Sequence, residues 1–331
     1  MKLGIAGCGR IAERGYVPAA LATEGVTIAG FADLDAARLR HCHELWEREG
    51  GGEAVAVTSV DELLRAPLDL LVVAVPATHH LAVAEEAAAA GVPSLVEKPP
   101  APLLAEAEKL AALDPTPFLA FNRRFLQGAE LRDRIPTEGW LELDLELRFR
   151  RDAWGAHQSH DEALLDAGIH LIDLACHLSG ADPIAVRRAE IAPERASLEL
   201  ELSRARARIS CATDRGHRET IAIRDRSGRT IAHSVWGGIG ARVSSLWGRP
   251  DPLVLSLQRQ LEALRATTPE LHQLLHPAEV EVDAVRGRED RMFLPSAADG
   301  VTAMAVVEAA RRSAELSGAE VTVAPLAGAS A

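Results

Sequence analysis

A glycine-rich motif near the start of the chain restricts its fold more than any other feature. Gly7-x-Gly9-x-x-Ala12 follows a mostly apolar segment, Lys2–Ala6, that is typical of a strand, and it opens a stretch, residues 10–23, that we predict to be helical. Strand, motif and helix in this order are the setting in which such glycines bind a dinucleotide. Gly7 would permit a tight turn, Gly9 would let the backbone approach a pyrophosphate at the helix N-terminus, and Ala12 would let helix and strand pack closely. The alternative is a tight turn without a ligand.

The first 120 residues alternate short apolar segments with amphipathic ones. We predict strands at residues 2–6, 26–32, 54–57, 68–75, 94–96 and 117–121, with helices between them. Alternation of this kind predicts an α/β fold with a parallel, doubly wound sheet. Asp33 ends the second strand, where a carboxylate can accept hydrogen bonds from an adenosine ribose and repel a 2′-phosphate. The sequence therefore favours NAD over NADP as cofactor.

The pattern changes after residue 121. Residues 140–150 alternate apolar with mostly charged side chains, and residues 197–211 and 219–234 alternate again, as strands with one buried face do. Further helices are predicted at residues 162–178, 252–266 and 301–316. We therefore predict two domains. A Rossmann dinucleotide-binding domain, residues 1–121, is followed by an α+β domain, residues 122–331, whose mostly antiparallel sheet is covered by helices on one side.

Charge and cysteine content disfavour several classes of protein. The chain has 36 Lys and Arg against 48 Asp and Glu, a net charge of −12, which disfavours nucleic acid and anionic membranes as partners. Between residues 187 and 229 eleven Arg stand against seven acids, which we interpret as a solvated strand face, with a polyanion site as the alternative. Four widely spaced cysteines and the lack of a segment of about 20 uncharged apolar residues favour a soluble, cytoplasmic protein without a bound metal.

Two polar segments directly follow predicted strands. Pro76-Ala77-Thr78-His79-His80 comes after the strand predicted at residues 68–75, and Glu97-Lys98-Pro99-Pro100 after the strand at residues 94–96. Ligands bind at the carboxyl ends of strands in open α/β sheets. A Lys before two prolines also lies in a stiff, extended segment, which restricts where its ammonium can point. The alternative is a solvated Lys in a proline-rich turn.

A third polar group lies on the helix predicted at residues 162–178. Asp166, His170 and Asp173 are spaced i, i+4 and i+7, and therefore share one helix face. A carboxylate beside an imidazole fixes the tautomer of the ring and raises its basicity, as a general base requires. A surface ion pair is the alternative. Metal ligation has weaker support, because no third ligand is near in the sequence.

Together these motifs resemble the Gfo/Idh/MocA family of glucose–fructose oxidoreductase and inositol dehydrogenase. The resemblance spans nearly the whole chain and is carried by the glycine motif, Pro76…His80, Glu97-Lys98-Pro99, Asn122-Arg123-Arg124-Phe125, Asp166-x-x-x-His170 and Ala298-Asp299-Gly300. It implies a Rossmann domain and a substrate-binding α+β domain whose sheet often mediates homodimers or homotetramers. It also implies NAD(P)-dependent hydride transfer to or from a carbinol or ketone of a sugar, a sugar derivative or a cyclitol.

The resemblance also implies roles for individual residues. Lys98 would hydrogen-bond the reacting oxygen, His170 would exchange its proton, and Asp166 would orient His170 or hold a neighbouring hydroxyl; these three are the expected catalytic residues. The expected cofactor site consists of Gly7, Gly9, Arg10, Ile11, Ala12, Asp33, Val75, Pro76, His80, Glu97 and Lys98. The expected substrate site consists of Lys98, Asn122, Arg123, Trp154, Asp166 and His170.

The chain departs from the family pattern in three places. It has His160-Asp161-Glu162-Ala163 where many relatives carry a glycine cluster, and Trp154-Gly155 where a Trp-Arg pair is common. His157 and His160 are candidates to act as polar groups there in place of the Arg. The outer face of residues 140–150 is charged and could pair with Arg204, Arg206 and Arg208 across strands, which weakens the case for dimerisation through an apolar sheet face. These departures leave the substrate open.

Two other functions compete with a dehydrogenase or reductase. Some relatives hydrolyse glycosides with tightly held NAD through transient oxidation, and others have kept the fold without the chemistry. A dehydrogenase would exchange its cofactor and accumulate reduced cofactor, whereas the glycoside hydrolase would retain and recycle it. The presence of Lys98, Asp166 and His170 together argues against a member without the chemistry.

Overall fold

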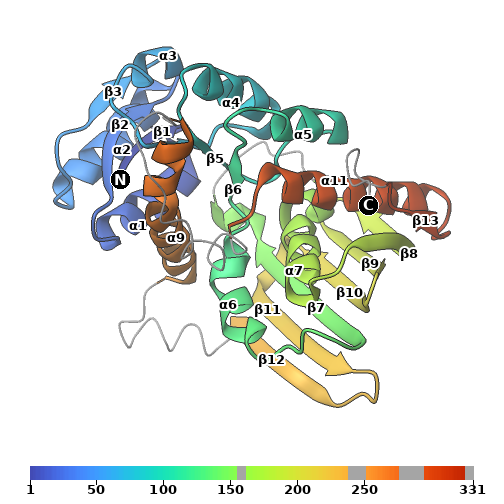
Figure 1. Cartoon of the computed structure of the whole chain (residues 1–331). Coiled ribbons are helices and arrows are strands. Elements are labelled where there is room, and N and C mark those ends of the chain that lie inside the picture. The colour runs from blue at the N-terminus through green and yellow to red at the C-terminus, as the bar shows by residue number, and fades with distance from the viewer. Residues whose placement is uncertain (155–161, 238–250, 276–293, 325–331) are drawn as a thin grey trace. The chain divides into compact units, whose positions relative to one another are not determined.

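The computed structural model describes residues 1–154, 162–237, 251–275 and 294–324. These residues form two compact units, each built from separate parts of the sequence (Figure 1). The first unit contains Met1–Phe125 and Asp251–Ala298, and the second contains Leu126–Pro250 and Asp299–Ala331.

The first unit contains a sheet in which all six strands are parallel, as the sequence predicts. Its order is β3 (Val55–Val57), β2 (Thr27–Ala32), β1 (Lys2–Ala6), β4 (Leu70–Val73), β5 (Ser94–Val96) and β6 (Phe118–Leu119). All four side chains of β4 are buried, as expected for a continuous apolar run in the middle of a parallel sheet. The order reverses between β1 and β4, and the crevice at such a reversal is where doubly wound sheets bind ligands.

Helices connect these strands, and local signals fix where several of them begin. They are η1 (Ala12–Tyr16), α1 (Val17–Ala22), α2 (Ala36–Arg48), α3 (Val60–Leu63), η2 (Ala77–His79), α4 (His80–Ala89), α5 (Leu104–Ala111) and η3 (Asn122–Phe125). The Asp35 carboxylate accepts hydrogen bonds from the amides of Ala37 and Arg38, and so caps α2. Ser59 caps α3 through the amide of Glu62. η1 is a π-helical turn, a form that occurs frequently at functional sites.

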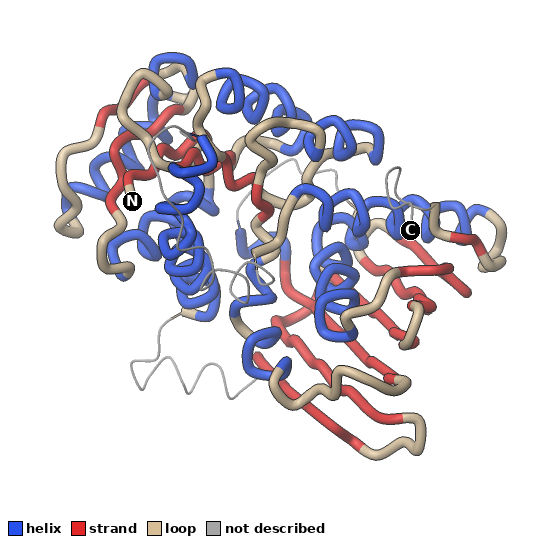
Figure 2. The backbone as a smooth tube through the Cα atoms, viewed as in Figure 1, coloured by secondary structure: helices blue, strands red, loops and turns tan. Residues whose placement is uncertain are grey.

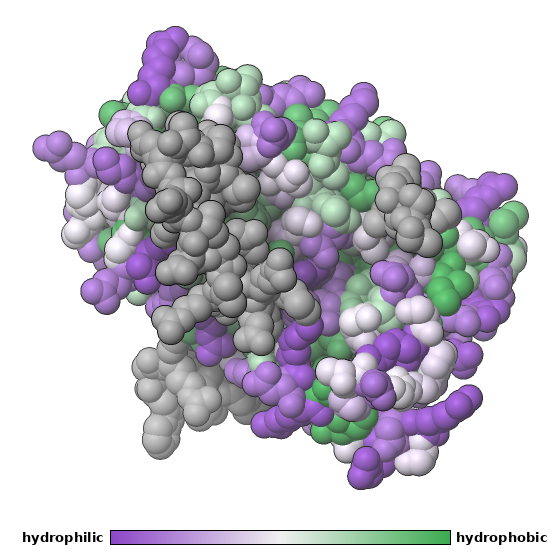
Figure 3. Space-filling model, in the orientation of Figure 1, coloured by the Kyte–Doolittle hydropathy of each residue, from purple (hydrophilic) through white to green (hydrophobic). Residues whose placement is uncertain are grey.

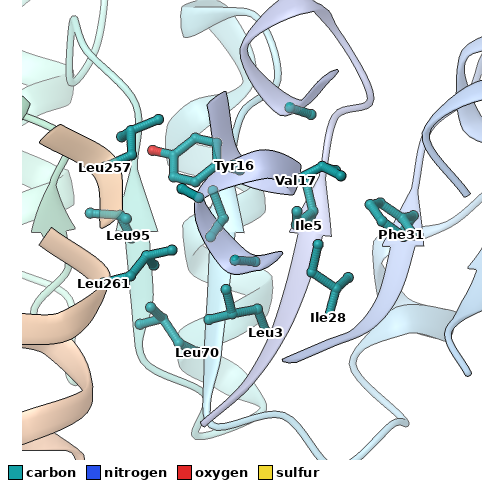
Figure 4. Packing of buried hydrophobic residues seen from close by; sticks show 14 of the residues in the cluster. Leu3, Ile5, Tyr16, Val17, Ile28, Phe31, Leu70, Leu95, Leu257 and Leu261 are labelled. Carbon is teal, nitrogen blue, oxygen red and sulfur yellow. The ribbon is translucent and has the colours of Figure 1, made fainter. Parts of the chain in front are cut away.

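Helix α9 (Pro252–Leu275) belongs to the first unit, so the second domain is not the continuous stretch of residues 122–331 that we expected. Its side chains Leu257, Leu261 and Leu264 are at most 1% exposed and join the core that contains Leu3 and Tyr16 (Figure 4). The spacing of these leucines identifies an amphipathic helix, but spacing does not indicate which of two sheets receives its apolar face. The predicted division at residue 121 is corrected accordingly: residues 251–298 belong to the first unit, not to the second.

The core position of α9 gives a stability prediction. Leu261→Ala is expected to lower the free energy of unfolding by about 2–4 kcal/mol, because truncation of a fully buried Leu loses apolar contact and leaves a cavity. Leu255→Ala, on the same helix but half-buried and outside this cluster, is the matched control and should cost less than about 1 kcal/mol. Urea denaturation measures both values, and equal losses would contradict the packing described for α9.

The second unit contains a seven-stranded mixed sheet. Its order is β12 (Thr230–Gly237), β11 (Asp214–Asp225), β7 (Leu141–Arg150), β10 (Ala205–Ala212), β9 (Arg195–Leu202), β8 (Pro183–Ala192) and β13 (Val321–Thr322). Only the neighbours β7 and β10 run parallel among these described strands, which confirms the mostly antiparallel sheet. β8 was not predicted, because register shifts interrupt the alternation of its buried and exposed residues.

The alternation of β7 separates its two faces as predicted. Its leucines are at most 2% exposed, and the helix α7 (Ile169–Ser179) packs against β7 and β10. Its other face carries ion pairs, among them the Asp144 carboxylate with Arg208 at 2.6 Å and with Arg224. These guanidinium groups hold the pKa of Asp144 below its ordinary value. We expected Arg204 to pair with this charged face. Its described hydrogen bonds are donated to the carbonyl oxygens of Pro136 and Thr137, in the loop before β7.

The described part of the second unit contains two further α-helices. The helices are α6 (Gln127–Arg132) and α11 (Ala297–Glu315), the first two residues of α11 being assigned to the first unit. Hydrophobic side chains drawn in colour in Figure 3 are scattered among hydrophilic ones, and Figure 2 shows how the strands and helices follow one another. Within the described ranges no helix is both long and apolar enough to cross a membrane.

Candidate functional site

The turn after β1 is shaped so that only glycine fits at its first position. Gly7 has φ +99°, and its amide donates to the carbonyl oxygen of Ala32 at 2.8 Å. A Cβ atom at Gly7 would lie 2.5 Å from the carbonyl oxygen of Ala74, which follows β4. The turn therefore approaches the main chain after β4 as closely as atoms allow, at the point where the strand order reverses.

The helix after this turn packs against the sheet as the motif predicts. Ala12 is fully buried, and Ile11 is half-buried against the same core. The Arg10 guanidinium pairs with Glu13 at 3.2 Å, and Glu13 also lies 3.4 Å from His41 of α2. Ile11 therefore packs into the protein, and the Arg10 side chain is held along η1 by its ion pair with Glu13. The main-chain N–H groups of a first helical turn lack partners within the helix, and such groups can bind an anion.

Asp33, at the end of β2, is anchored to the same turn. Its carboxylate accepts a hydrogen bond from the amide of Cys8 at 2.6 Å and another from the amide of Asp35 at 2.8 Å. The thiol of Cys42 donates to the carbonyl oxygen of Cys8 at 3.7 Å, so the residue between the two glycines is held on both sides. A carboxylate fixed in this way is presented at the carboxyl edge of the sheet, where the ribose of a dinucleotide binds.

Glu97 joins the glycine-motif helix to the segment that carries Lys98. The Tyr16 hydroxyl donates to one carboxylate oxygen of Glu97 at 2.7 Å, and the Lys98 amide donates to the other at 3.1 Å. Burial raises the pKa of Glu97, whereas the positive charge of Lys98 opposes this rise. Burial also raises the pKa of Tyr16, so its hydroxyl stays protonated and remains a donor. Glu97 was expected at the cofactor; its described hydrogen bonds are with the protein.

His80 begins α4 and is 1% exposed. Its Nδ1 atom lies 3.0 Å from the carbonyl oxygen of Pro99 and 3.3 Å from that of Pro100. Its Nε2 atom lies 2.9 Å from the carbonyl oxygen of Val75. Burial lowers the pKa of His80. We expected His80 to contact the cofactor, but both ring nitrogens face main-chain oxygens of the protein. Val75 and Pro76, expected in the same site, form the turn between β4 and η2.

The Asn122–Phe125 turn follows β6 at the same edge of the sheet. Asn122 is 7% exposed, and its side-chain oxygen has no hydrogen-bond partner within the described part of the chain. Helix α9 holds this turn and the strand before it: Gln260 donates to the carbonyl oxygen of Leu119, the last residue of β6, at 2.8 Å, and Arg259 donates to that of Phe125, the last residue of the turn, at 3.1 Å. Sequence reasoning missed both residues, since nothing near them marks a site.

The second unit holds the Asp166 and His170 pair. A π-helical turn, η5 (Leu164–Gly168), precedes α7, so Asp166 and His170 do not follow the regular α-helical phase that we predicted. The Asp166 carboxylate contacts the Arg151 guanidinium, with Nε at 3.1 Å and a terminal nitrogen at 3.0 Å. His170 is 6% and Asp173 3% exposed. Arg151 was not predicted, although it lies in the same chain segment as Trp154.

The segment that replaces the family's glycine cluster is partly described. Glu162 forms an ion pair with Arg311 of α11, which offsets the charge of this one carboxylate. Trp154 ends the short helix η4 (Arg151–Trp154). The candidates His157 and His160 lie outside the described residues.

The site residues thus fall into two groups. The glycine turn, Asp33, Lys98 and the Asn122–Phe125 turn lie in the first unit, all after carboxyl ends of parallel strands. Asp166 and His170 lie in the second unit. Within the residues that the structure describes, no cluster of three or more His, Cys, Asp or Glu could hold a metal ion.

Comparison with known proteins gives a family-model match for the N-terminal part of the first unit. Residues 1–115 match the model of the Gfo/Idh/MocA oxidoreductases, described as an oxidoreductase family with an NAD-binding Rossmann fold. The chain is also 33% identical over 190 residues to YceM of Salmonella typhimurium, which is named as an oxidoreductase. That match covers 55% of this chain and 57% of YceM, so the chain spans only a little over half of that relative.

Solved structures share the fold over nearly the whole chain. A protein described as a myo-inositol dehydrogenase from Sinorhizobium meliloti superposes with a TM-score of 0.72 at 19% identity, covering 98% of this chain and 100% of that chain. A myo-inositol dehydrogenase from Corynebacterium glutamicum gives 0.72 at 18% identity, covering 98% and 99%. An Agrobacterium radiobacter oxidoreductase, solved with NAD⁺, L-tartaric acid and magnesium, gives 0.66 at 18% identity, covering 98% of each chain. At such identities these matches show the fold alone.

Proposed function

Because residues 1–115 match the model of the Gfo/Idh/MocA oxidoreductases, we propose that the whole chain is a member of this family. We propose that it is an NAD-dependent oxidoreductase acting on a carbinol or ketone of a sugar, a sugar derivative or a cyclitol. One observation carries the proposal furthest. The segment with Lys98 is tied through Glu97 and Tyr16 to the helix of the glycine motif. The main chain from which the Lys98 side chain extends is thereby held at the edge of the sheet where the nicotinamide half of a dinucleotide would lie.

The residues of the first unit fit NAD. The glycine turn leaves no room for a Cβ atom, the start of η1 offers main-chain N–H groups to the pyrophosphate, and Asp33 offers a carboxylate to the ribose. Bound NAD would supply the hydride acceptor, carbon C4 of its nicotinamide ring. The protein supplies position and charge around the reacting carbon.

Three side chains would act on the substrate during oxidation. His170 takes the proton of the hydroxyl group as the hydride leaves the same carbon, and the C–O bond becomes a carbonyl. Lys98 donates a hydrogen bond to that oxygen and stabilises its developing negative charge. Asp166 holds a neighbouring hydroxyl or orients His170, and its ion pair with Arg151 favours the ionised carboxylate.

Asp33 gives a prediction for cofactor choice. The wild-type chain should bind NADH at least about 10-fold more tightly than NADPH, since a carboxylate at this position repels a 2′-phosphate. Asp33→Ala should reduce the ratio of the two Kd values and weaken NADH as well, because the amide of Cys8 loses its acceptor. Asp35→Ala, which removes the α2 cap and the ion pair with Arg38 but leaves Asp33 in place, should leave the ratio unchanged. Calorimetric titration measures both constants for each protein; a higher affinity of the wild type for NADPH would contradict this role of Asp33.

A substrate panel tests the proposed reaction. Purified protein is mixed with NAD⁺ and with individual cyclitols, aldoses and sugar acids, and absorbance of NADH is followed. Net NADH formation with at least one polyol is expected. The alternative, a glycoside hydrolase that oxidises its substrate transiently, predicts sugar release from aryl glycosides with retained cofactor and no net NADH. Tight NADH binding with neither activity would favour a non-catalytic family member.

A further inference from the structure

His80 lies between the segment that follows β4 and the segment that follows β5. Its ring contacts main-chain oxygens on both sides: Nε2 faces Val75, after β4, and Nδ1 faces Pro99 and Pro100, after β5. The residue before Pro99 is Lys98. The imidazole thus links the turn after β4 to the proline segment beside Lys98.

The ring can donate only one hydrogen in its neutral form. Its two nitrogens face three carbonyl oxygens, none of which can donate. Burial favours the neutral ring and lowers the pKa of His80, so one nitrogen carries hydrogen and the other faces an oxygen without one. Two oxygens converge on Nδ1, at 3.0 and 3.3 Å, whereas one lies near Nε2. Hydrogen on Nδ1 therefore satisfies the larger number of acceptors.

Pro99 and Pro100 have no amide hydrogen and cannot anchor their own segment by donation. Their carbonyl oxygens are buried with the rest of these residues. An N–H group from His80 consequently provides a hydrogen bond that the local sequence cannot. On the N-terminal side of the proline segment, the Glu97 carboxylate accepts a hydrogen bond from the Lys98 amide. Lys98 thus lies between two anchored points of the main chain.

We propose that His80 is a positioning residue for Lys98: its Nδ1–H group binds the carbonyl oxygens of Pro99 and Pro100 and so fixes the segment from which the Lys98 ammonium extends. This inference rests on the proposed function only for the consequence on catalysis. The position of Lys98 itself is measurable without a substrate.

Two amide variants separate the two sides of the ring. In His80→Asn the amide nitrogen is attached where Nδ1 is, and it can still donate to Pro99 and Pro100. In His80→Gln the amide nitrogen lies near the place of Nε2 and can donate only to Val75. His79→Gln changes the exposed neighbour and is the control.

The low lysine content makes Lys98 directly observable. The chain has three lysines, Lys2, Lys98 and Lys109, so protein labelled with ¹³C at the lysine ε-carbon gives three signals. We expect the Lys98 signal to be unchanged in His80→Asn and in the control, but shifted and broadened in His80→Gln. The Lys2 and Lys109 signals should not move in any variant, and NADH affinity should change by less than about threefold. With an active substrate, His80→Gln should lower kcat by about 10- to 100-fold.

Any other pattern in folded variants overturns the proposal. An unchanged Lys98 signal in His80→Gln would show that His80 does not position it, and a shifted signal in His80→Asn would show that Nδ1 donation is not the cause. If the variants do not fold, ¹⁵N spectra of labelled histidine in the wild-type protein give the tautomer. Hydrogen on Nδ1 alone is expected, and hydrogen on Nε2, or on both nitrogens, overturns the proposal. Failure of the substrate panel would leave these spectra unaffected, so the two hypotheses fail separately.

Discussion

Lys98→Met is expected to lower kcat by about 10²–10³-fold while the affinity for NADH stays close to that of the wild type, because the substitution removes charge stabilisation at the reacting oxygen and not cofactor binding. His170→Asn should lower kcat by about 10²–10⁴-fold, the usual contribution of a general base. Both values are measured with the polyol that reduces NAD⁺ fastest, and NADH affinity is measured by calorimetry on the same preparations.

Matched controls exist for both substitutions. Lys109→Met changes an exposed lysine of α5, and His177→Asn changes a buried histidine of α7, the helix that carries His170. Neither control should lower kcat by more than about twofold, a change within the range of substitutions outside a site. Wild-type kcat in Lys98→Met or His170→Asn would remove that residue from the catalytic group.

Gly7→Ala is expected to have the second large effect, on cofactor binding. The new Cβ atom would lie 2.5 Å from the carbonyl oxygen of Ala74, and the φ angle of +99° is unfavourable for any residue with a Cβ. The turn must shift away from β4, and a displacement that costs about 3 kcal/mol corresponds to roughly 100-fold weaker NADH binding. Calorimetric titration with NADH measures the loss.

Gly52→Ala is the matched control for this prediction. Gly52 has no atom within 4 Å of a built Cβ, so the substitution should leave NADH affinity unchanged. Gly7→Ala protein that binds NADH with the wild-type Kd would contradict the assignment of this turn to the pyrophosphate. Circular dichroism of both variants checks that each is folded.

The parallel sheet was predictable because each of its signals is local. A buried strand such as β4 has a continuous apolar sequence, and the glycine motif marks a tight turn followed by the start of a helix. The charged and apolar faces of β7 likewise follow from its alternation. Strand β8 escaped prediction where register shifts interrupt that period.

The candidate site was predictable only in part, since several of its contacts join residues far apart in sequence. Gln260 and Arg259 hold the end of β6 and the Asn122–Phe125 turn from more than 130 residues away, and the prediction placed their helix in the other domain. Arg151 pairs with Asp166 across 15 residues. For His80, the sequence did not indicate its partners, because no sequence pattern shows that a ring faces main-chain oxygens. Motif residues were therefore easier to find than the residues that hold them.

Transfer of a substrate hydrogen to the cofactor tests the central claim most directly. The most active polyol of the panel is prepared with deuterium at its reacting carbon and incubated with the protein and NAD⁺, and the released cofactor is examined by mass spectrometry and NMR. Hydride transfer predicts one deuterium at C4 of the nicotinamide ring, on a single face, in amounts equal to the carbonyl product. Product formed with unlabelled cofactor, or with deuterium recovered in water, would contradict the account.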